Sequence, residues 1–450
     1  MKILFISNGF PPKHWAGTET YTANIAREVK DRGNSVQVLC RGGWDNGPRY
    51  WNGYDDSVYD SVPVRRINLN WEKIHDPASY LFDNPIIGEY VDHYLDEYEP
   101  DLVHVTSCES LSASVLSVVK NKKIPLVLSI TDFWFLCPRI NLLQSNGENC
   151  DGIKMPWECQ HCLANHADIY RWPRSILPEK GVELLLTMAG KTPLISRRRG
   201  FRGHIQDMEK RKKFLRSAFS LPDVRLTASE FVKNVHINAG FDNPIQVQPY
   251  GHDLSWLKEM PGQTNGKQVR IGFIGQIVPS KGVHILLEAA KLLEDNVKNK
   301  FSIFIYGDPN KDPEYGARLR EIGNEIKNVQ YCGTYFHDES AKIFAEIDVL
   351  VVPSLWYDFP LIIYEAFAAK KPVIASNLGG MAEAVEDEKN GLLFESENIT
   401  ELAQQIERLI REPNLLKKLS AGISEVKTIR EEGDELVGIY EDLINKFSYR

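Results

Sequence analysis

Short apolar runs typical of β-strands alternate with amphipathic stretches typical of helices along most of this chain. In the first part, the expected strands are residues 3–7, 35–39, 62–69, 102–105 and 126–130. One expected helix runs from Thr20 to Arg32, with Tyr21, Ile25 and Val29 on its apolar face, and Gly33 ends it. Because strands joined by helices form parallel sheets, the pattern predicts an α/β fold.

The alternation is interrupted once and then resumes. Residues 132–221 show no clear strand and are interpreted as an insertion. Beyond them the expected strands are 225–228, 245–248, 269–274, 302–306, 329–331, 349–352, 373–375 and 392–394. Polar residues 261–268 resemble a linker. The chain of 450 residues is therefore divided into a domain at 1–258, a second domain at 268–433 and a final helical segment at 434–450.

Composition restricts the class of protein. The hydrophobic share of 43% and the charged share of 25% are those of a folded soluble enzyme. A formal net charge of −8 argues against nucleic acid as a partner. No apolar run approaches the roughly 18 residues of a membrane span, and the N-terminus reads as a strand rather than a signal peptide. We therefore expect a cytoplasmic protein.

Several motifs occur in the order found in one enzyme family. They are FPPKHWAGTET (10–20), TASEF (227–231), GFIGQIVPSKG (272–282), IYGD (305–308) and the segment from Val349 to Phe394. Together they resemble glycosyltransferase family 4, whose members have the GT-B fold. The resemblance implies two facing Rossmann-like domains with parallel sheets and an interdomain cleft. It also implies a retaining transfer of a sugar from a nucleotide-sugar donor, a UDP- or GDP-sugar.

Departure of the diphosphate leaving group requires stabilisation of negative charge. Some folds use a metal held by Asp-x-Asp, a motif that this sequence lacks, so we expect no catalytic metal. Backbone amides at helix starts and fixed cations can replace the metal. Gly17 lies in one such loop, and Lys281 would reach a diphosphate oxygen from another. An ordinary helix start is the alternative for Gly17, and a surface lysine is the alternative for Lys281. The resemblance also assigns Gln276 to donor binding, although the family usually has arginine there.

The segment after the strand at 349–352 carries the other implied donor contacts. Amides of Phe359, Pro360 and Leu361 would face the distal phosphate and donor sugar, and Glu365 would bind the ribose hydroxyls. The family has a second Glu eight residues before this acid, where this chain has Tyr357, so a one-residue deletion would bring Asp358 into that role. Gly307 ends a neighbouring strand and resembles the positions that contact the base. It is equally compatible with an ordinary turn.

The first domain is expected to hold the acceptor. The family often has His-Asp after the strand at 126–130, where this chain has Thr131 and Asp132. Asp132 is therefore included among the catalytic candidates. Thr131 cannot carry a proton at neutral pH. His104 and His252 follow strands, but packed structural histidines are the simpler interpretation. Cys332 is interpreted as a core residue.

Cys137, Cys150, Cys159 and Cys162 follow the spacing C-x12-C-x8-C-x2-C. Four cysteines with one CxxC pair are typical of a structural zinc site, and four thiolates would leave no open position for catalysis. An iron–sulfur cluster and four free thiols are the alternatives. His161 and His166 leave exchange of a ligand open.

Residues 197–216 contain nine basic and two acidic residues. Such a run could contact an anionic membrane, with Phe201, Phe214 and Leu215 as shallow anchors. A solvated helix face is an equally good interpretation.

Taken together, these features favour a glycosyltransferase that acts on a glycan or lipid-linked acceptor, in surface polysaccharide or glycolipid synthesis, in the cytoplasm or at the inner face of the membrane. A nucleotide-sugar epimerase on the same fold is one alternative, and Thr131 speaks against it. A non-catalytic nucleotide-sugar-binding or scaffold protein is the other, favoured by the departures at Ala16, Thr131, Gln276 and Tyr357.

Overall fold

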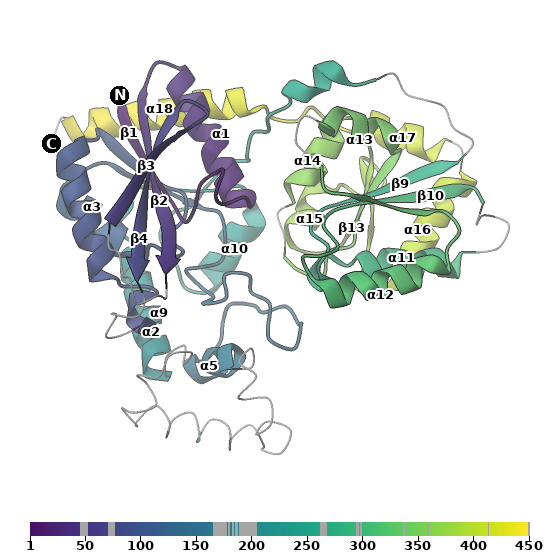
Figure 1. The fold of residues 1–450 in the computed structure, drawn as a ribbon, viewed down its shortest axis with the longest axis horizontal. Coiled ribbons are helices and arrows are strands. Elements are labelled where there is room, and N and C mark those ends of the chain that lie inside the picture. The colour runs from purple at the N-terminus through teal and green to yellow at the C-terminus, as the bar shows by residue number, and fades with distance from the viewer. Residues whose placement is uncertain are drawn as a thin grey trace. The chain divides into compact units, whose positions relative to one another are not determined.

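The computed structural model of the chain forms two compact units, which are described separately (Figure 1). It describes residues 1–45, 53–70, 77–164, 178, 181, 184, 188, 205–261, 268–293, 297, 299–335, 339–357, 360–412 and 414–448. Unit 1 contains Met1–Tyr250 and Ile429–Arg450, and unit 2 contains Gly251–Thr428. The units thus divide at residue 250, whereas the sequence places the domain boundary at 258.

Unit 1 is built on a sheet of eight strands in the order β3-β4-β2-β1-β5-β6-β7-β8. The strands are β1 Lys2–Ser7, β2 Ser35–Asp45, β3 Gly53–Tyr59, β4 Val62–Asn70, β5 Leu102–Val105, β6 Leu126–Ile130, β7 Val224–Thr227 and β8 Gln246–Val247. All pairings are parallel except that of β3 with β4. The sequence did not predict β3, because this edge strand is almost wholly exposed and carries no apolar pattern.

Helices cover the sheet of unit 1. They are α1 Gly17–Asp31, α2 Pro77–Tyr80, α3 Pro85–Tyr98, α4 Ser114–Asn121, α5 Pro156–Ala164, α9 Ile205–Phe219, α10 Glu230–Asn238 and α18 Ile429–Ser448. Side-chain N-caps stabilise the start of two of these helices. The side chain of Asn84 accepts hydrogen bonds from two amides of α3, and the side chain of Ser229 caps α10. The cysteine-bearing segment and α5 follow β6, at the lower part of this unit in Figure 1.

The C-terminal helix α18 belongs to unit 1 and packs on α1. The hydroxyl of Tyr21 donates to buried Glu432 over 3.0 Å. The hydroxyl of Tyr440 lies 2.6 Å from Nδ1 of His104, whose Nε2 lies 2.8 Å from the hydroxyl of Ser129. His104 is thus a fully buried structural histidine, and burial lowers its pKa to about 3. The last segment of the chain therefore completes the core of the first sheet.

Unit 2 is a parallel sheet of six strands in the order β11-β10-β9-β12-β13-β14. The strands are β9 Val269–Ile274, β10 Phe301–Tyr306, β11 Val329–Gly333, β12 Val349–Val352, β13 Val373–Ser376 and β14 Gly391–Phe394. The helices are η3 Ser255–Glu259, η4 Pro279–Lys281, α11 Val283–Leu292, α12 Pro313–Asn324, α13 Ser340–Glu346, α14 Leu361–Ala368, α15 Gly379–Ala384, α16 Ile399–Arg411 and α17 Leu415–Ala421. Buried strands with apolar residues on both faces form its two cores.

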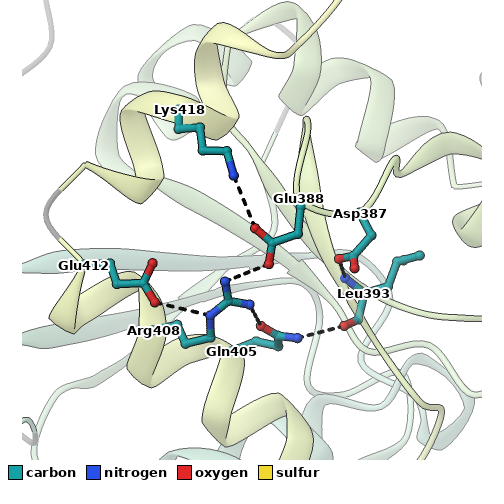
Figure 2. Close-up of polar contacts among 7 residues, drawn as sticks. All are labelled: Asp387, Glu388, Leu393, Gln405, Arg408, Glu412 and Lys418. Carbon is teal, nitrogen blue, oxygen red and sulfur yellow. Dashed lines mark hydrogen bonds and ion pairs between the residues drawn. The ribbon is translucent and has the colours of Figure 1, made fainter.

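A polar network joins the turn before β14 to α16 and α17 (Figure 2). The guanidinium of Arg408 contacts Glu388 at 2.7 Å, Gln405 at 3.0 Å and Glu412 at 3.3 Å. Lys418 adds a weaker contact to Glu388 at 3.4 Å. These groups are partly exposed, so each pair stabilises the fold only weakly. The network fixes the turn that leads into the edge strand β14.

We expect Arg408→Ala to lower the free energy of unfolding by about 0.5–1 kcal/mol, because it removes a cation shared by several partners. Urea unfolding measures the change. Arg411→Ala is the matched control, since the ion pair of Arg411 is with Glu407 of the same helix, at 2.6 Å. Equal losses in the two variants would contradict the idea that Arg408 links α16 to the turn.

Candidate functional site

In unit 2, loops from several strands meet at the carboxyl edge of the sheet, where open α/β sheets bind ligands. The loop after β12 lies against the loop after β9: the amide of Leu355 donates to the carbonyl of Ser280 over 2.9 Å, and the hydroxyl of Ser354 reaches the same oxygen at 3.2 Å. Gly282 has φ +72°, and a Cβ there would lie 1.8 Å from the carbonyl oxygen of Pro353. Only glycine permits this contact between the loops.

Lys281 ends the short helix η4 in this loop cluster. Its ammonium lies 5.2 Å from the ring centroid of Trp356, a cation–π distance. Burial lowers the pKa of Lys281 to about 8. An anionic ligand beside this lysine would stabilise the charged ammonium and would raise its pKa again. Trp356 was not singled out from the sequence, since one tryptophan in a loop has no pattern.

Two further glycines close the same edge. The amide of Gly275 donates to the carbonyl of Tyr306, and that of Gly307 donates to the carbonyl of Gly333. A Cβ on Gly307 would lie 2.2 Å from the carbonyl oxygen of Gly275. Gly307 therefore has a structural reason to be glycine, and its predicted role at the base stays a prediction. Gln276 follows Gly275 in the loop after β9, and its side chain is exposed.

Helix α14 begins at Leu361 with Pro360 at its N-cap. Asp358 and Phe359 lie outside the described residues. Glu365 is partly buried on α14. The pKa of the nearby Tyr335 hydroxyl is raised mainly by the burial of Tyr335 and, to a smaller extent, by the charge of Glu365. The structure thus places Pro360, Leu361 and Glu365 on one short segment that follows β12, as the sequence predicts.

His252 is a buried group near α14 that the sequence predicts to be a packed structural histidine, with a position facing the cleft as the alternative. Its ring stacks on Tyr364 with centroids 5.0 Å apart, and its Nε2 has no hydrogen-bond partner among the described residues. Burial lowers its pKa to about 4, so the ring is neutral at pH 7. The stacking fits the packed role.

In unit 1, the first turn of α1 meets the ends of β5 and β6 through hydroxyl groups. Thr18 donates to the hydroxyl of Thr131 over 3.1 Å, and Thr131 donates to the carbonyl of Thr106 over 2.9 Å. Thr131 therefore serves as a hydrogen-bonding link at the position where the related family often has histidine. Gly17, the first residue of α1, is exposed one residue before this link.

Asp132 lies one residue further and has acidic neighbours. The amide of Trp134 donates to one carboxylate oxygen over 2.8 Å, and the hydroxyl of Ser107 donates to the other over 3.4 Å. Burial, with smaller contributions from the charges of Glu109 and Glu19, raises the pKa of Asp132 to about 7. Asp132 is therefore poised to exchange a proton near neutral pH.

Glu19 and Glu109 were not predicted as site residues. Glu19 is buried, accepts from Asn8 at 3.3 Å through Oε1, and has no hydrogen-bond partner for Oε2 among the described residues. Its position in the first turn of α1 looks in the sequence like an ordinary helix-start acid.

No steric contact within the described part of the protein requires glycine at position 17. A Cβ added there would meet nothing within 4 Å. We expect Gly17→Ala to leave the melting temperature unchanged or slightly raised. If a phosphate approaches the amide as predicted, the same variant should raise the donor KM on the order of tenfold, the cost of about 1.4 kcal/mol. An unchanged KM would remove Gly17 from the site.

The four cysteines at 137, 150, 159 and 162 form no disulfide bonds, and burial raises the pKa of the first three. Across the described ranges, no three His, Cys, Asp or Glu side chains come together as a metal site. His166 lies outside those ranges. Cys332 is exposed, so its interpretation as a core residue was wrong. Its strand β11 lies at the edge of the sheet, and the three central residues of this strand are all exposed.

Part of the basic run lies on helix α9, and residues 197–204 are outside the description. Leu215 is fully buried in the core of unit 1, and Phe214 packs on Phe82 with centroids 5.8 Å apart. Leu215 is thus unavailable as a membrane anchor, and that expectation was wrong for this residue, whereas Phe214 is partly buried. Lys210, Lys212, Lys213 and Arg216 are exposed. No helix in the described parts of the chain is both long and apolar enough to span a bilayer.

A cavity of about 540 Å³ lies along α16 and is lined by Gln404, Glu407, Arg408, Arg411 and Glu412. The C-terminal half of this helix lies near the turn that precedes β14, as Figure 2 shows for Arg408 and Glu388. This is the edge where strands begin, opposite to the edge that carries Lys281. The cavity is therefore separate from the candidate site.

Two family models match the chain in succession. Residues 16–169 match a glycosyl transferase 4-like domain, and residues 258–425 match glycosyl transferases group 1. The chain carries both glycosyltransferase domains. The first match lies in unit 1 and covers Gly17 and Asp132, and the second lies in unit 2 and covers Lys281 and Glu365.

Several solved structures share the fold over nearly the whole chain. Sucrose-phosphate synthase from Thermosynechococcus elongatus aligns with a TM-score of 0.62 at 15% identity, over 99% of this chain and 100% of that one. Anabaena HepE in complex with UDP aligns with a TM-score of 0.60 at 17% identity, over 100% of each chain. Both glycosyltransferase domains are thus parallel-sheet α/β domains of the GT-B class, as the sequence predicts.

Curated relatives match shorter stretches. A glycosyltransferase of Methanocaldococcus jannaschii is 35% identical over 147 residues, 33% of this chain and 40% of that protein. A D-inositol 3-phosphate glycosyltransferase of Streptomyces bingchenggensis is 32% identical over 157 residues, 33% of this chain and 34% of that protein. The chain therefore spans less than half the length of these relatives.

Proposed function

We propose that this chain is a retaining glycosyltransferase that moves a sugar from a UDP- or GDP-sugar to a glycan or lipid-linked acceptor. The observation that carries the proposal is the position of Lys281 and Glu365. Both lie in loops or helices that follow strands β9 and β12 of the group 1 domain, at the ligand-binding edge of its sheet. A diphosphate and a ribose need a cation and a hydroxyl acceptor of this kind.

In the proposed reaction, the bond between the anomeric carbon and the diphosphate oxygen breaks, and a bond from an acceptor oxygen to that carbon forms. Lys281 and the amides at the start of α14 would stabilise the charge that develops on the diphosphate. We propose no catalytic metal, since the full sequence has no Asp-x-Asp motif. Pro360 at the N-cap leaves the first amides of α14 free of any side-chain cap.

The acceptor is assigned to unit 1 in this proposal. Asp132, with a pKa of about 7, would accept a hydrogen bond from the acceptor hydroxyl and take its proton when the new bond forms. Relatives with glycosyltransferase names support transfer as the reaction class. HepE, crystallised with UDP-glucose, supports a uridine nucleotide as the first donor to try.

Incubation of the purified chain with UDP-, GDP- and ADP-sugars tests the proposal. We expect one donor to raise the melting temperature and to release its nucleotide when acceptor glycans or glycolipids are added. An altered sugar without nucleotide release would indicate an epimerase. Binding without turnover for every acceptor would indicate a non-catalytic nucleotide-sugar-binding protein. Both of these results would reject the proposed reaction.

We also propose that the chain works on the cytoplasmic side of a membrane, in the synthesis of a surface polysaccharide or glycolipid. The exposed lysines of α9 support contact with anionic lipid. We expect sedimentation with vesicles containing phosphatidylglycerol, and little with phosphatidylcholine alone. Reversing the charge at Lys212 and Lys213 should weaken binding at least about 30-fold, because each basic residue contributes about 1 kcal/mol. The same change at exposed Lys311 and Lys327 of unit 2 is the matched control, and equal effects would contradict the assignment.

A further inference from the structure

The four cysteines lie in one folded segment of unit 1, residues 137–162, here called the four-cysteine segment. Cys137 is in a turn after β6, and Cys159 and Cys162 are three residues apart on α5, a spacing that places them on one face of the helix. Between them, an antiparallel bridge joins Leu143 to Asn149 and returns the chain toward its start. The amide of Cys150 then donates to the carbonyl of Leu142 over 2.7 Å.

Backbone and side-chain N–H groups already point at three of the four sulfurs. The amide of Arg139 lies 3.4 Å from Sγ of Cys137, and the amide of Gly152 lies 3.5 Å from Sγ of Cys150. In each case the donor is two residues after the cysteine, so two separate turns repeat one geometry. The guanidinium of Arg139 also lies 3.6 Å from Sγ of Cys162. A thiolate is a far better acceptor for such donors than a neutral thiol.

A buried arginine lies beside the same segment. Arg211 on α9 is buried and donates to the backbone carbonyl of Trp134. Within the described ranges, no carboxylate forms an ion pair with it. The sulfurs of Cys137 and Cys159 and the carboxyl group of Asp132 lie close enough to Arg211 to interact with its charge. A buried guanidinium is unfavourable unless negative charge lies nearby, so thiolates at Cys137 and Cys159 would stabilise it together with the carboxyl group of Asp132.

We propose that Cys137, Cys150, Cys159 and Cys162 bind one zinc ion as four thiolates, with Arg139 and Arg211 offsetting the charge of the complex. A zinc tetrathiolate has a net charge of −2, which two guanidinium groups balance. Each cysteine S–H gives its proton to solvent when the Zn–S bond forms, so four protons leave per ion. The sulfurs are not grouped as ligands in this structure, so binding must draw them together within the segment.

The proposed ion fixes the part of unit 1 that begins at Asp132. The turn of Cys137 hydrogen-bonds back to that region, because the amides of Leu136 and Cys137 both donate to the carbonyl of Phe133. Four protein ligands leave no place for a substrate, so the ion is structural. The inference does not depend on the proposed function, since the site would exist in a catalytic or a non-catalytic chain.

Metal analysis of the full chain, purified without a histidine tag from medium with zinc and iron, tests this site. We expect one zinc per chain, no iron, and a fall in melting temperature when a mercurial reagent releases the metal. Cobalt substituted for zinc should give sulfur-to-cobalt charge-transfer absorption. Cys150→Ser and Cys162→Ser should lose the metal, whereas Cys332→Ser, an exposed cysteine of unit 2, should keep it. Iron with visible absorption, or no metal and four reactive thiols, would overturn the proposal.

The arginines provide a readout that a folding defect does not mimic. We expect Arg139→Gln and Arg211→Met to weaken zinc binding at least tenfold in competition with a chelator, as the loss of groups that contact metal ligands does. Arg211→Lys keeps the charge and should retain most of the affinity. Arg216→Met on the exposed side of α9 is the control and should bind zinc as the native chain does. Unchanged affinity in both Arg139→Gln and Arg211→Met would remove them from the proposal.

Discussion

Replacing Lys281 by methionine is expected to lower kcat/KM for the nucleotide-sugar donor by about 10²–10³, the loss typical of one group that stabilises a developing oxyanion. Methionine keeps the apolar contact with Trp356 and removes only the charge. Lys281→Arg should retain more activity, because its charge remains. Lys311→Met, at an exposed lysine of the same unit, is the control. A loss of less than threefold in Lys281→Met would reject the assignment.

The lowered pKa of Lys281 adds a pH dependence to the same prediction. In the free protein the ammonium loses its proton as the pH rises through about 8, so the donor KM should rise above that pH. Lys281→Arg should abolish this rise, because arginine stays charged. Stability follows the opposite course. The folded pKa is below the unfolded value of 10.5, so the charged lysine disfavours folding below pH 8, and this penalty disappears as the pH rises from 8 to 10.5.

The sequence predicted the parallel strands and the place of Lys281 because both depend on local pattern. Five of the six strands of unit 2, β9, β10, β12, β13 and β14, are largely buried apolar runs bounded by turns. A lysine between a strand and a helix must lie at the carboxyl edge of the sheet, whatever the rest of the fold does. Lys281, Gly307 and Glu365 could therefore be placed before any coordinates were known.

Features that depend on packing between distant segments could not be predicted in this way. Leu215 follows a run of basic residues, and an apolar side chain in this position suits either a membrane anchor or a core contact. Only the pairing of α9 with the sheet of unit 1 decides for the core. Two other contacts join residues that are far apart in the chain or lie on irregular loops. One is the contact of Trp356 with Lys281, and the other is the position of Arg211 beside the cysteines. Side chains in such places follow no period that a sequence pattern detects.

Replacing Glu365 by alanine is expected to abolish the rise in melting temperature that the nucleotide-sugar donor produces in the native chain. A carboxylate that accepts from two ribose hydroxyls makes two charged hydrogen bonds, each worth about 1.5–3 kcal/mol. Their loss would weaken donor binding by at least about 10², enough to remove the stabilisation when the donor is present at a few times its native Kd.

The variant is informative because its unliganded fold should change little. Glu365 is only partly buried on α14, with the hydroxyl of Tyr335 close enough to feel its charge. Glu365→Gln keeps the shape of the side chain and should retain a small shift, since its amide oxygen still accepts. Glu321→Ala, at an exposed acid on α12, should behave as the native chain. A full shift in Glu365→Ala would show that the ribose is held elsewhere, whereas Lys281 would keep its separate role at the diphosphate.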